Sequence, residues 1–153
     1  MRLALLIQNR IINPLVRVLI RAGLAPPTYA LLETTGRRSG RPRQIPVANG
    51  LHDDTFWLIA ALGKKAHYVR NIEAQPQVRV KARPARLRDG LRMRWRSGIA
   101  RVIPDDDARA RQRQLGAGRP AYRADGLLLR ALAAVAGGKL VTVRIDLDPA
   151  AKT

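Results

Sequence analysis

The sequence contains no cysteine among its 153 residues. A disulfide framework, a thiolate nucleophile and a zinc site built on cysteine are therefore excluded. The chain also has only two histidines and no Gly-x-Ser-x-Gly elbow, no His-Glu-x-x-His motif and no Walker phosphate loop. Metal-free acid–base hydrolysis is disfavoured for these reasons. The lack of cysteine fits a reducing, cytoplasmic setting.

Aromatic residues are scarce, at 4% of the chain, so few side chains could stack on the bases of a single-stranded nucleic acid. Long apolar runs are missing as well. Arginines interrupt the first 23 residues, which leaves no stretch close to the roughly 20 apolar residues that span a bilayer. No cleavage site for a signal peptide is evident there.

The same first 23 residues predict an amphipathic helix. Ile7, Ile11 and Leu15 recur at helical spacing, whereas Arg10 and Arg17 fall on another face. Two interpretations stay open. The helix packs on its own domain, or it makes a peripheral contact with an anionic membrane, such as the inner face of the cell membrane.

Positive charge is what the sequence has in excess. The chain carries 29 Lys+Arg against 11 Asp+Glu, a formal net charge of +18. This balance favours anionic partners such as nucleic acid, an anionic membrane, or phosphate and carboxylate ligands. With 46% hydrophobic residues, the chain is long enough for one folded domain. We expect this domain at residues 29–148, after an N-terminal segment at 1–28.

Alternating apolar residues predict a series of short strands with helices between them. Strands are expected at 29–35, 45–51, 55–62, 78–82, 93–103 (with a bulge at Ser97-Gly98) and 141–147, and helices at 66–74, after Asp105–Asp107, and after Asp125. The strands at 45–51 and 55–62 are expected to form a hairpin. Because a regular βαβ alternation is absent, the pattern predicts an α+β fold with a mostly antiparallel sheet or small barrel and flanking helices.

The most informative segment is 34–43, which reads TTGRRSGRPR. Its glycines, Gly36 and Gly40, let the backbone turn sharply and expose amides that can bind an anion. Arginine guanidinium groups add forked, charge-assisted hydrogen bonds, and Ser39 adds a hydroxyl. From the residues alone, the segment is either an anchor for phosphate or carboxylate, or a basic surface turn.

A second feature is the pair of small residues Ala60-Ala61 near the end of a predicted strand. Small side chains at a strand end let a flat group approach the backbone. A planar ligand at Ala60-Ala61 with its anionic tail at the arginine segment would use both features. Close packing of the chain against itself is the alternative.

Four segments, in order, resemble the deazaflavin-dependent nitroreductase family. Residues 31–46 (LLETTGRRSGRPRQIP) resemble its opening signature, and residues 63–76 (GKKAHYVRNIEAQP) resemble its second motif. The stretches 95–106 and 140–147 are similar to one branch of the family. The resemblance covers the chain from about Ala30 to Leu147.

This resemblance implies a split β-barrel of the FMN-binding type that binds the reduced deazaflavin coenzyme F-420. It also implies three groups of coenzyme-binding residues. They are Arg37, Arg38, Ser39 and Arg43 (with Gly40 and Pro46 in the same motif) for the phosphate and the acidic tail; Ala60, Ala61, Gly63 and Lys64 for the ring; and His67 and Asn71 beside it.

The implied activity is hydride transfer from reduced F-420 to a small organic acceptor of quinone, enone or nitroaromatic type. Tyr68 or His67 could donate a proton to the acceptor, although aromatic packing explains Tyr68, and a polar position at a helix end explains His67, at least as well. Many relatives carry Pro-x-Trp-Tyr where this chain has Ala66-His67-Tyr68-Val69. The region after Leu115, where the substrate-facing residues of the family lie, differs most, so the acceptor is not carried over. Three alternatives remain: a deazaflavin protein without catalysis, FMN in place of F-420, and a basic nucleic-acid-binding module, which is disfavoured. The sequence does not predict the oligomeric state.

Overall fold

The computed structural model describes residues 28–83, 92–117 and 139–149, together with the single positions Val18, Ala22, Arg119 and Ala134. The predicted N-terminal helix and the helix predicted after Asp125 lie outside these ranges. No helix in the described part of the chain is long and apolar enough to cross a membrane.

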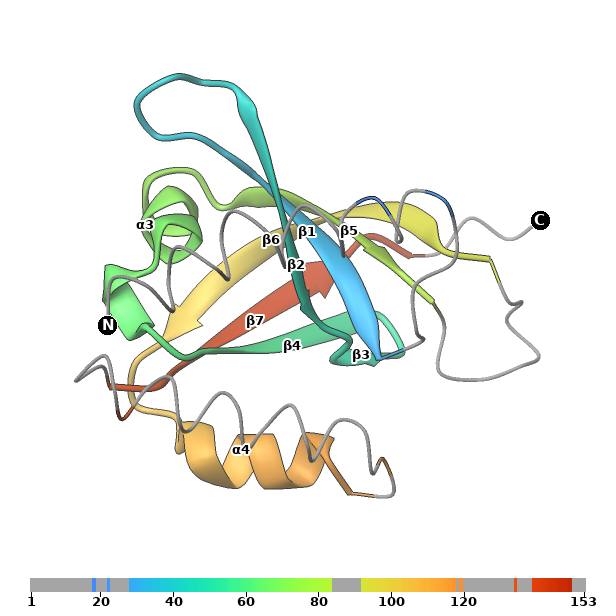
Figure 1. The fold of residues 1–153 in the computed structure, drawn as a ribbon, viewed down its shortest axis with the longest axis vertical. Coiled ribbons are helices and arrows are strands. Elements are labelled where there is room, and N and C mark those ends of the chain that lie inside the picture. The colour runs from blue at the N-terminus through green and yellow to red at the C-terminus, as the bar shows by residue number, and fades with distance from the viewer. Residues whose placement is uncertain are drawn as a thin grey trace.

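Seven strands form one antiparallel sheet with the order β2-β1-β5-β6-β7-β4-β3. The strands are β1 (Tyr29–Thr35), β2 (Pro42–Ala48), β3 (Leu51–His52), β4 (Thr55–Ala60), β5 (Gln77–Ala82), β6 (Arg94–Ile103) and β7 (Val141–Leu147). The sheet curls into a half barrel, and the β1–β2 hairpin projects beyond the other strands (Figure 1). The predicted α+β split barrel with a mostly antiparallel sheet is confirmed.

The core lies on the inner face of the curled sheet. In β5, Val78, Val80 and Ala82 are buried and alternate with the exposed Gln77 and Arg79 and the half-buried Lys81. This period of two is what a half-buried strand requires. Phe56 of β4 is the largest fully buried side chain among the described residues.

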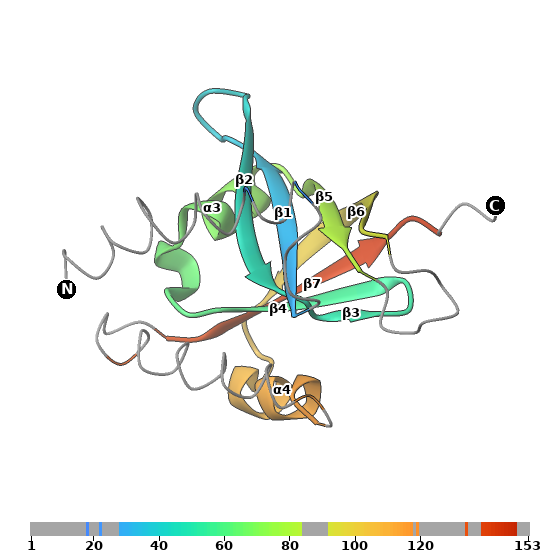
Figure 2. The same ribbon diagram turned by 45° about the vertical axis from the view of Figure 1, so that its right-hand side comes forward.

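Two helices and one 3-10 turn complete the described fold: η2 (Gly63–Lys65), α3 (His67–Ala74) and α4 (Ala108–Leu115). Both helices lie close to their predicted positions. The Asp107 carboxylate caps α4, because it accepts hydrogen bonds from the backbone N–H groups of Arg109 and Ala110 at 3.0 Å each. α3 packs against β1 and β6, whereas α4 packs against β4 and β7 and lies apart from α3 (Figure 2).

The predicted strand 45–51 is wrong in its bounds and in its partner. Residues 42–48 form β2, which pairs with β1, and only Leu51 and His52 pair with β4. The break falls at Gly50, where a Cβ atom would overlap the carbonyl oxygen of Trp57. The chain therefore leaves β1 at this close approach and forms a short hairpin through the Asp53-Asp54 turn.

The predicted bulge at Ser97-Gly98 is also wrong. Gly98 pairs with Val78 on one side and with Leu147 on the other, in continuous register. A Cβ atom at Gly98 would lie only 2.5 Å from the carbonyl oxygen of Asp146. Glycine is thus explained by close approach of β7 and not by an extra residue in the strand.

Candidate functional site

The loop between β1 and β2 is a tight, internally hydrogen-bonded turn. The Gly36 N–H donates to the carbonyl of Arg41 at 2.9 Å, and the Gly40 N–H donates to the carbonyl of Gly36 at 2.7 Å. Gly40 has a φ of +63°, in the left-handed region that favours glycine. The two glycines of the predicted anion-binding segment thus fix the shape of the turn.

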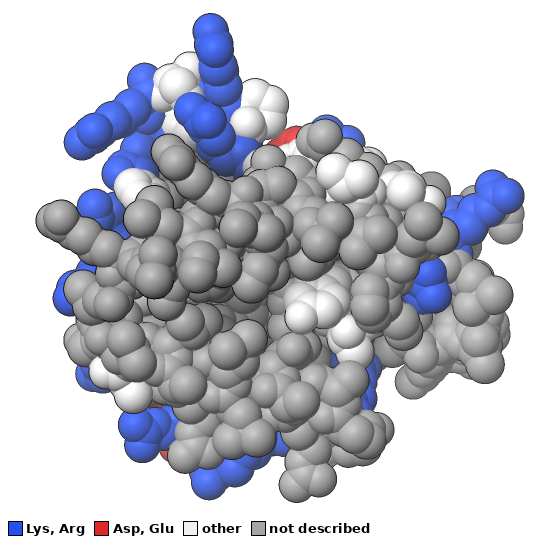
Figure 3. Space-filling model, in the orientation of Figure 1, with Lys and Arg blue, Asp and Glu red and all other residues white. Residues whose placement is uncertain are grey.

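Four arginines extend from this turn and from the start of β2: Arg37, Arg38, Arg41 and Arg43. Arg37 is half-buried, and the other three are exposed. None of the residues that the structure describes gives any of the four a carboxylate partner. Figure 3 shows the resulting group of Lys and Arg side chains at the top of the molecule, over the β1–β2 hairpin.

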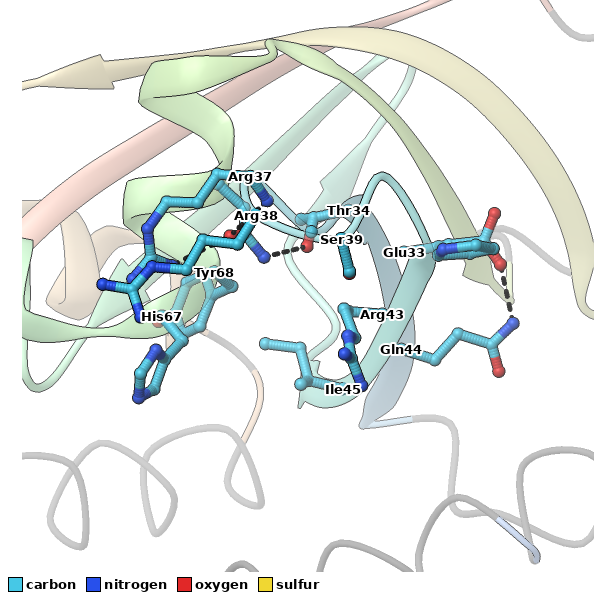
Figure 4. Close-up of a pocket in the computed structure, with 13 residues that line it drawn as sticks. Glu33, Thr34, Arg37, Arg38, Ser39, Arg43, Gln44, Ile45, His67 and Tyr68 are labelled. Carbon is cyan, nitrogen blue, oxygen red and sulfur yellow. Dashed lines mark hydrogen bonds between the residues drawn. The ribbon is translucent and has the colours of Figure 1, made fainter.

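A cleft of about 740 Å³ lies between this turn and the start of α3. Its lining includes Arg37, Arg38, Ser39 and Arg43 from the hairpin and His67, Tyr68 and Asn71 from α3. In Figure 4, Arg37 and Arg38 lie on the side of His67 and Tyr68, with Arg43 and Ile45 facing them. The structure thus brings six of the predicted coenzyme-binding residues together. Tyr68, the candidate proton donor, lines the same cleft.

Tyr68 and His67 differ in their surroundings. His67 is exposed, whereas Tyr68 is partly buried and packs against the core. Burial raises the pKa of the Tyr68 phenol well above its ordinary value. The phenol is protonated at neutral pH, as an unperturbed tyrosine also is, and can donate a hydrogen bond at the cleft.

Asn71 is buried, with 5% of its surface exposed. Its Oδ1 accepts from the backbone N–H of Arg37 at 3.3 Å and from Arg37 Nη1 at 3.1 Å. Its Nδ2 donates to Oγ1 of Thr34 at 3.1 Å. The Asn71 side chain thus connects α3 to the end of β1 and to the first arginine of the turn.

Glu33 and Gln44 also line the cleft, and the sequence analysis missed both. The two residues are paired across β1 and β2, and Gln44 Nε2 donates to Glu33 Oε2 at 2.7 Å. The other carboxylate oxygen of Glu33 accepts from Arg79 Nη1 at 3.2 Å. The strand register was the missing signal, because it places Glu33 opposite Gln44. The ion pair with Arg79 offsets the negative charge of Glu33, so this carboxylate repels an anion in the cleft less than a free one would.

The remaining predicted coenzyme-binding residues are not part of the cleft lining. They are Gly40, Pro46, Ala60, Ala61, Gly63 and Lys64. Ala60 and Ala61 are buried, and Lys64 Nζ lies 3.7 Å from Glu73 Oε1. Gly63 has a φ of +52°, and a Cβ atom there would overlap the carbonyl oxygen of Lys139, so the fold itself requires glycine. Contact of these six residues with a coenzyme stays a prediction.

The donor set of the cleft fits a coenzyme that carries a phosphate and an acidic tail. Guanidinium groups without carboxylate partners bind such anions through charge-assisted, often bidentate hydrogen bonds. The cleft volume also lies within the range that ligand-binding clefts occupy. The described residues include no cluster of three or more metal-ligating side chains.

A curled antiparallel sheet with an arginine-rich cleft beside the β1–β2 turn defines a split-barrel protein that binds an anionic cofactor. Residues 20–126 match the family of the F420H(2)-dependent quinone reductases, and the chain belongs to this family. No curated protein matches the sequence.

Solved structures share the fold at low sequence identity. The heme storage protein HutZ from Vibrio cholerae is 15% identical with a TM-score of 0.56, over 88% of this chain and 92% of that one. An F420-H2 dependent reductase, FDR-A, is 17% identical with a TM-score of 0.51, over 77% and 93% of the two chains. At these identities the structures support the fold alone.

The family establishes the class of the protein as an oxidoreductase that uses reduced F-420. The resemblance seen in the sequence motifs and the predicted coenzyme are confirmed at this level.

Proposed function

We propose that this protein transfers a hydride from reduced F-420 to a quinone. The observation that carries the proposal is a set of three arginines, Arg37, Arg38 and Arg43, that line the cleft and lack carboxylate partners in the described part of the chain. The family, whose members are named for quinone reduction, supports the choice of acceptor.

Each group of residues has a distinct role in this proposal. Arg37, Arg38 and Arg43 hold the phosphate and the acidic tail through their guanidinium groups, and Ser39 adds its hydroxyl. When bound, the reduced deazaflavin supplies the hydride. The protein positions the reactants and excludes competing water.

Reduction of a quinone by a hydride also requires a proton at the oxygen that becomes negatively charged. Tyr68 lines the cleft, and its phenol carries a proton at neutral pH, as an ordinary tyrosine does. We assign the phenol of Tyr68 as the proton donor, with solvent restoring the proton afterwards. The more exposed His67 is the second candidate.

The activity is tested by following oxidation of reduced F-420 by its absorbance, with a soluble naphthoquinone, an enone or a nitroaromatic as acceptor. We expect oxidation that depends on both protein and quinone, and a rate at least about tenfold lower for Tyr68→Phe. His67→Gln, at the same helix end, tests the second candidate: a loss of about tenfold in that variant and not in Tyr68→Phe would assign the proton donor to His67. Absence of quinone-dependent oxidation, although the coenzyme binds, would contradict quinone reduction.

We further propose that the protein works in the cytoplasm, at the inner face of the membrane. Support comes from the net charge of +18, because anionic lipid attracts basic protein surfaces. The test is sedimentation with vesicles of phosphatidylglycerol or of phosphatidylcholine, with and without residues 1–23. Association that needs both anionic lipid and residues 1–23 is the expected result. Equal recovery with both lipids would contradict it.

A further inference from the structure

Asn71 combines two properties that separate it from the other cleft residues. It is nearly fully buried, and three hydrogen bonds to other protein groups already occupy its carboxamide. A carboxamide oxygen has two lone pairs and the amide nitrogen two N–H donors. Oδ1 accepts both of its hydrogen bonds from Arg37, and one N–H of Nδ2 donates to Thr34, so most of the carboxamide is engaged by other protein groups.

The Arg37 contacts are unusual because one oxygen binds both the backbone and the side chain of the same residue. The backbone N–H of Arg37 approaches Asn71 Oδ1 at 3.3 Å and Nη1 approaches it at 3.1 Å. This arrangement fixes the guanidinium relative to its own backbone. Arg38, Arg41 and Arg43 are exposed by comparison. In the described part of the chain, no side chain forms a hydrogen bond with the guanidinium group of any of these three arginines.

Thr34 holds the other end of the carboxamide. Its side chain is 2% exposed, and Oγ1 accepts from Asn71 Nδ2 at 3.1 Å. Thr34 lies at the end of β1 and is paired with Arg43 across the hairpin. The rigid sheet therefore orients Asn71, and Asn71 orients Arg37.

We propose that Asn71, held by Thr34, is a positioning residue that fixes the Arg37 guanidinium for an anion in the cleft. This inference rests on the proposed function for the identity of the anion as F-420. A guanidinium held in place loses less conformational entropy when its ligand binds, and so binds more tightly than a free one.

The central test is a double-mutant cycle with Arg37→Ala, Asn71→Ala and the double variant. Binding is measured by fluorescence titration with F-420 and by calorimetry with pyrophosphate as a second anionic probe. We expect Asn71→Ala to weaken binding about tenfold and Arg37→Ala more strongly, with the double variant no weaker than Arg37→Ala alone. A double variant in which the two losses multiply would overturn the proposal, because Asn71 would then act independently of Arg37.

Asn71→Asp provides a readout that a purely structural role would not change. A carboxylate can accept both Arg37 N–H groups, and the Thr34 hydroxyl can turn to donate to it, so we expect the melting temperature to be maintained. The new negative charge lies against the guanidinium and competes with the ligand, so binding is expected to weaken at least about tenfold. Unchanged binding of both probes by Asn71→Asp would overturn the proposal.

Asn49→Ala is the matched control, because Asn49 is similarly buried and its amide donates to the carbonyl of Arg83, away from the cleft lining. It should lower the melting temperature but leave both affinities unchanged. The two probes separate this inference from the function. Coupled binding of pyrophosphate without binding of F-420 would refute the coenzyme and keep the positioning role, whereas F-420 binding without coupling would do the reverse. If neither probe binds the wild-type protein, both proposals fail.

Discussion

The β1–β2 turn and the α4 side of the sheet use the same residue, arginine, in opposite ways. On the α4 side, Arg111 Nη2 lies 3.0 Å from the Asp106 carboxylate, and the guanidinium lies 4.1 Å from the centre of the Trp57 ring. Arg144 likewise pairs with Asp146 at 2.8 Å. On the turn, no described carboxylate neutralises Arg37, Arg38, Arg41 or Arg43.

The two regions differ in the partners of their arginines: on the α4 side these are carboxylates and an aromatic ring, and on the turn the described residues supply no carboxylate. Pairing with a carboxylate and an aromatic ring uses the charge to hold α4 on the sheet. Four arginines crowded on one turn repel one another, and an anionic ligand relieves this repulsion. The net charge of +18 by itself therefore does not indicate a binding site, whereas the arginines of the turn that lack carboxylate partners do.

Neutralising the turn should have the largest effect on binding and almost none on folding. We expect a quadruple variant, in which Arg37, Arg38, Arg41 and Arg43 are all replaced by Gln, to bind F-420 at least about a hundredfold more weakly. Each charge-assisted hydrogen bond contributes about 1.5–3 kcal/mol. Titration and thermal melting measure the two properties. A large drop in the melting temperature of this variant, together with the loss of affinity, would show that the turn arginines also hold the fold together and would remove the distinction between the two regions.

The reverse pattern is expected for Arg111→Ala. Loss of its ion pair with Asp106 and its contact with Trp57 should lower the free energy of unfolding by about 2 kcal/mol, with F-420 affinity unchanged. Arg113→Ala, on an exposed position of the same helix, is the control and should change stability by less than about 0.5 kcal/mol. Chemical denaturation measures both. Equal effects of the two substitutions would show that the pairing of Arg111 does not stabilise the fold.

The shape of the turn is tested by Gly40→Ala. The substitution has space, because no atom lies within 4 Å of the added Cβ, but it forces alanine to a φ of +63°. The strain should cost about 1 kcal/mol and weaken coenzyme binding a fewfold. Gly40→Asn is the matched variant, since asparagine tolerates this backbone conformation better. If the Gly40→Ala and Gly40→Asn variants both bind F-420 as tightly as the wild-type protein does, the conformation of the turn is irrelevant to binding.

The smallest effect concerns pH. Hydrogen bonding from Arg111, followed by that from Thr142, lowers the pKa of Asp106 below its ordinary value. A lowered pKa in the folded state stabilises the protein above the ordinary aspartate pKa of about 4, and this stability is lost as the pH falls through the lowered value. Asp106→Asn should thus be less stable than wild type by about 1 kcal/mol at pH 7, with the difference shrinking below pH ~4. A difference that is independent of pH would contradict this role.

The sequence predicted the strands and helices that follow a clear period, but not the close approaches between strands. β7 and the burial of Val78 and Val80 follow directly from alternating side chains, and β1 follows from a short apolar run. The break at Gly50 and the regular pairing of Gly98 depend on where another backbone lies, and local sequence does not contain that information.

The candidate site divides in a similar way. Arg37, Arg38, Ser39 and Arg43 are adjacent in the sequence, so their motif identified them. The pairing of Glu33 with Gln44 and Arg79 depends on strand register. Asn71 was predicted as a ligand from its motif, and only the geometry reveals that its hydrogen bonds go to Arg37 and Thr34.

The most direct test of the central claim is a fluorescence titration of the wild-type protein with F-420, at low and at moderate salt, in competition with FMN and with a short DNA duplex. The account predicts saturable binding that neither competitor displaces, with weaker affinity at the higher salt concentration because the arginines bind an anion. Displacement by FMN, or binding of the duplex in place of F-420, would contradict it.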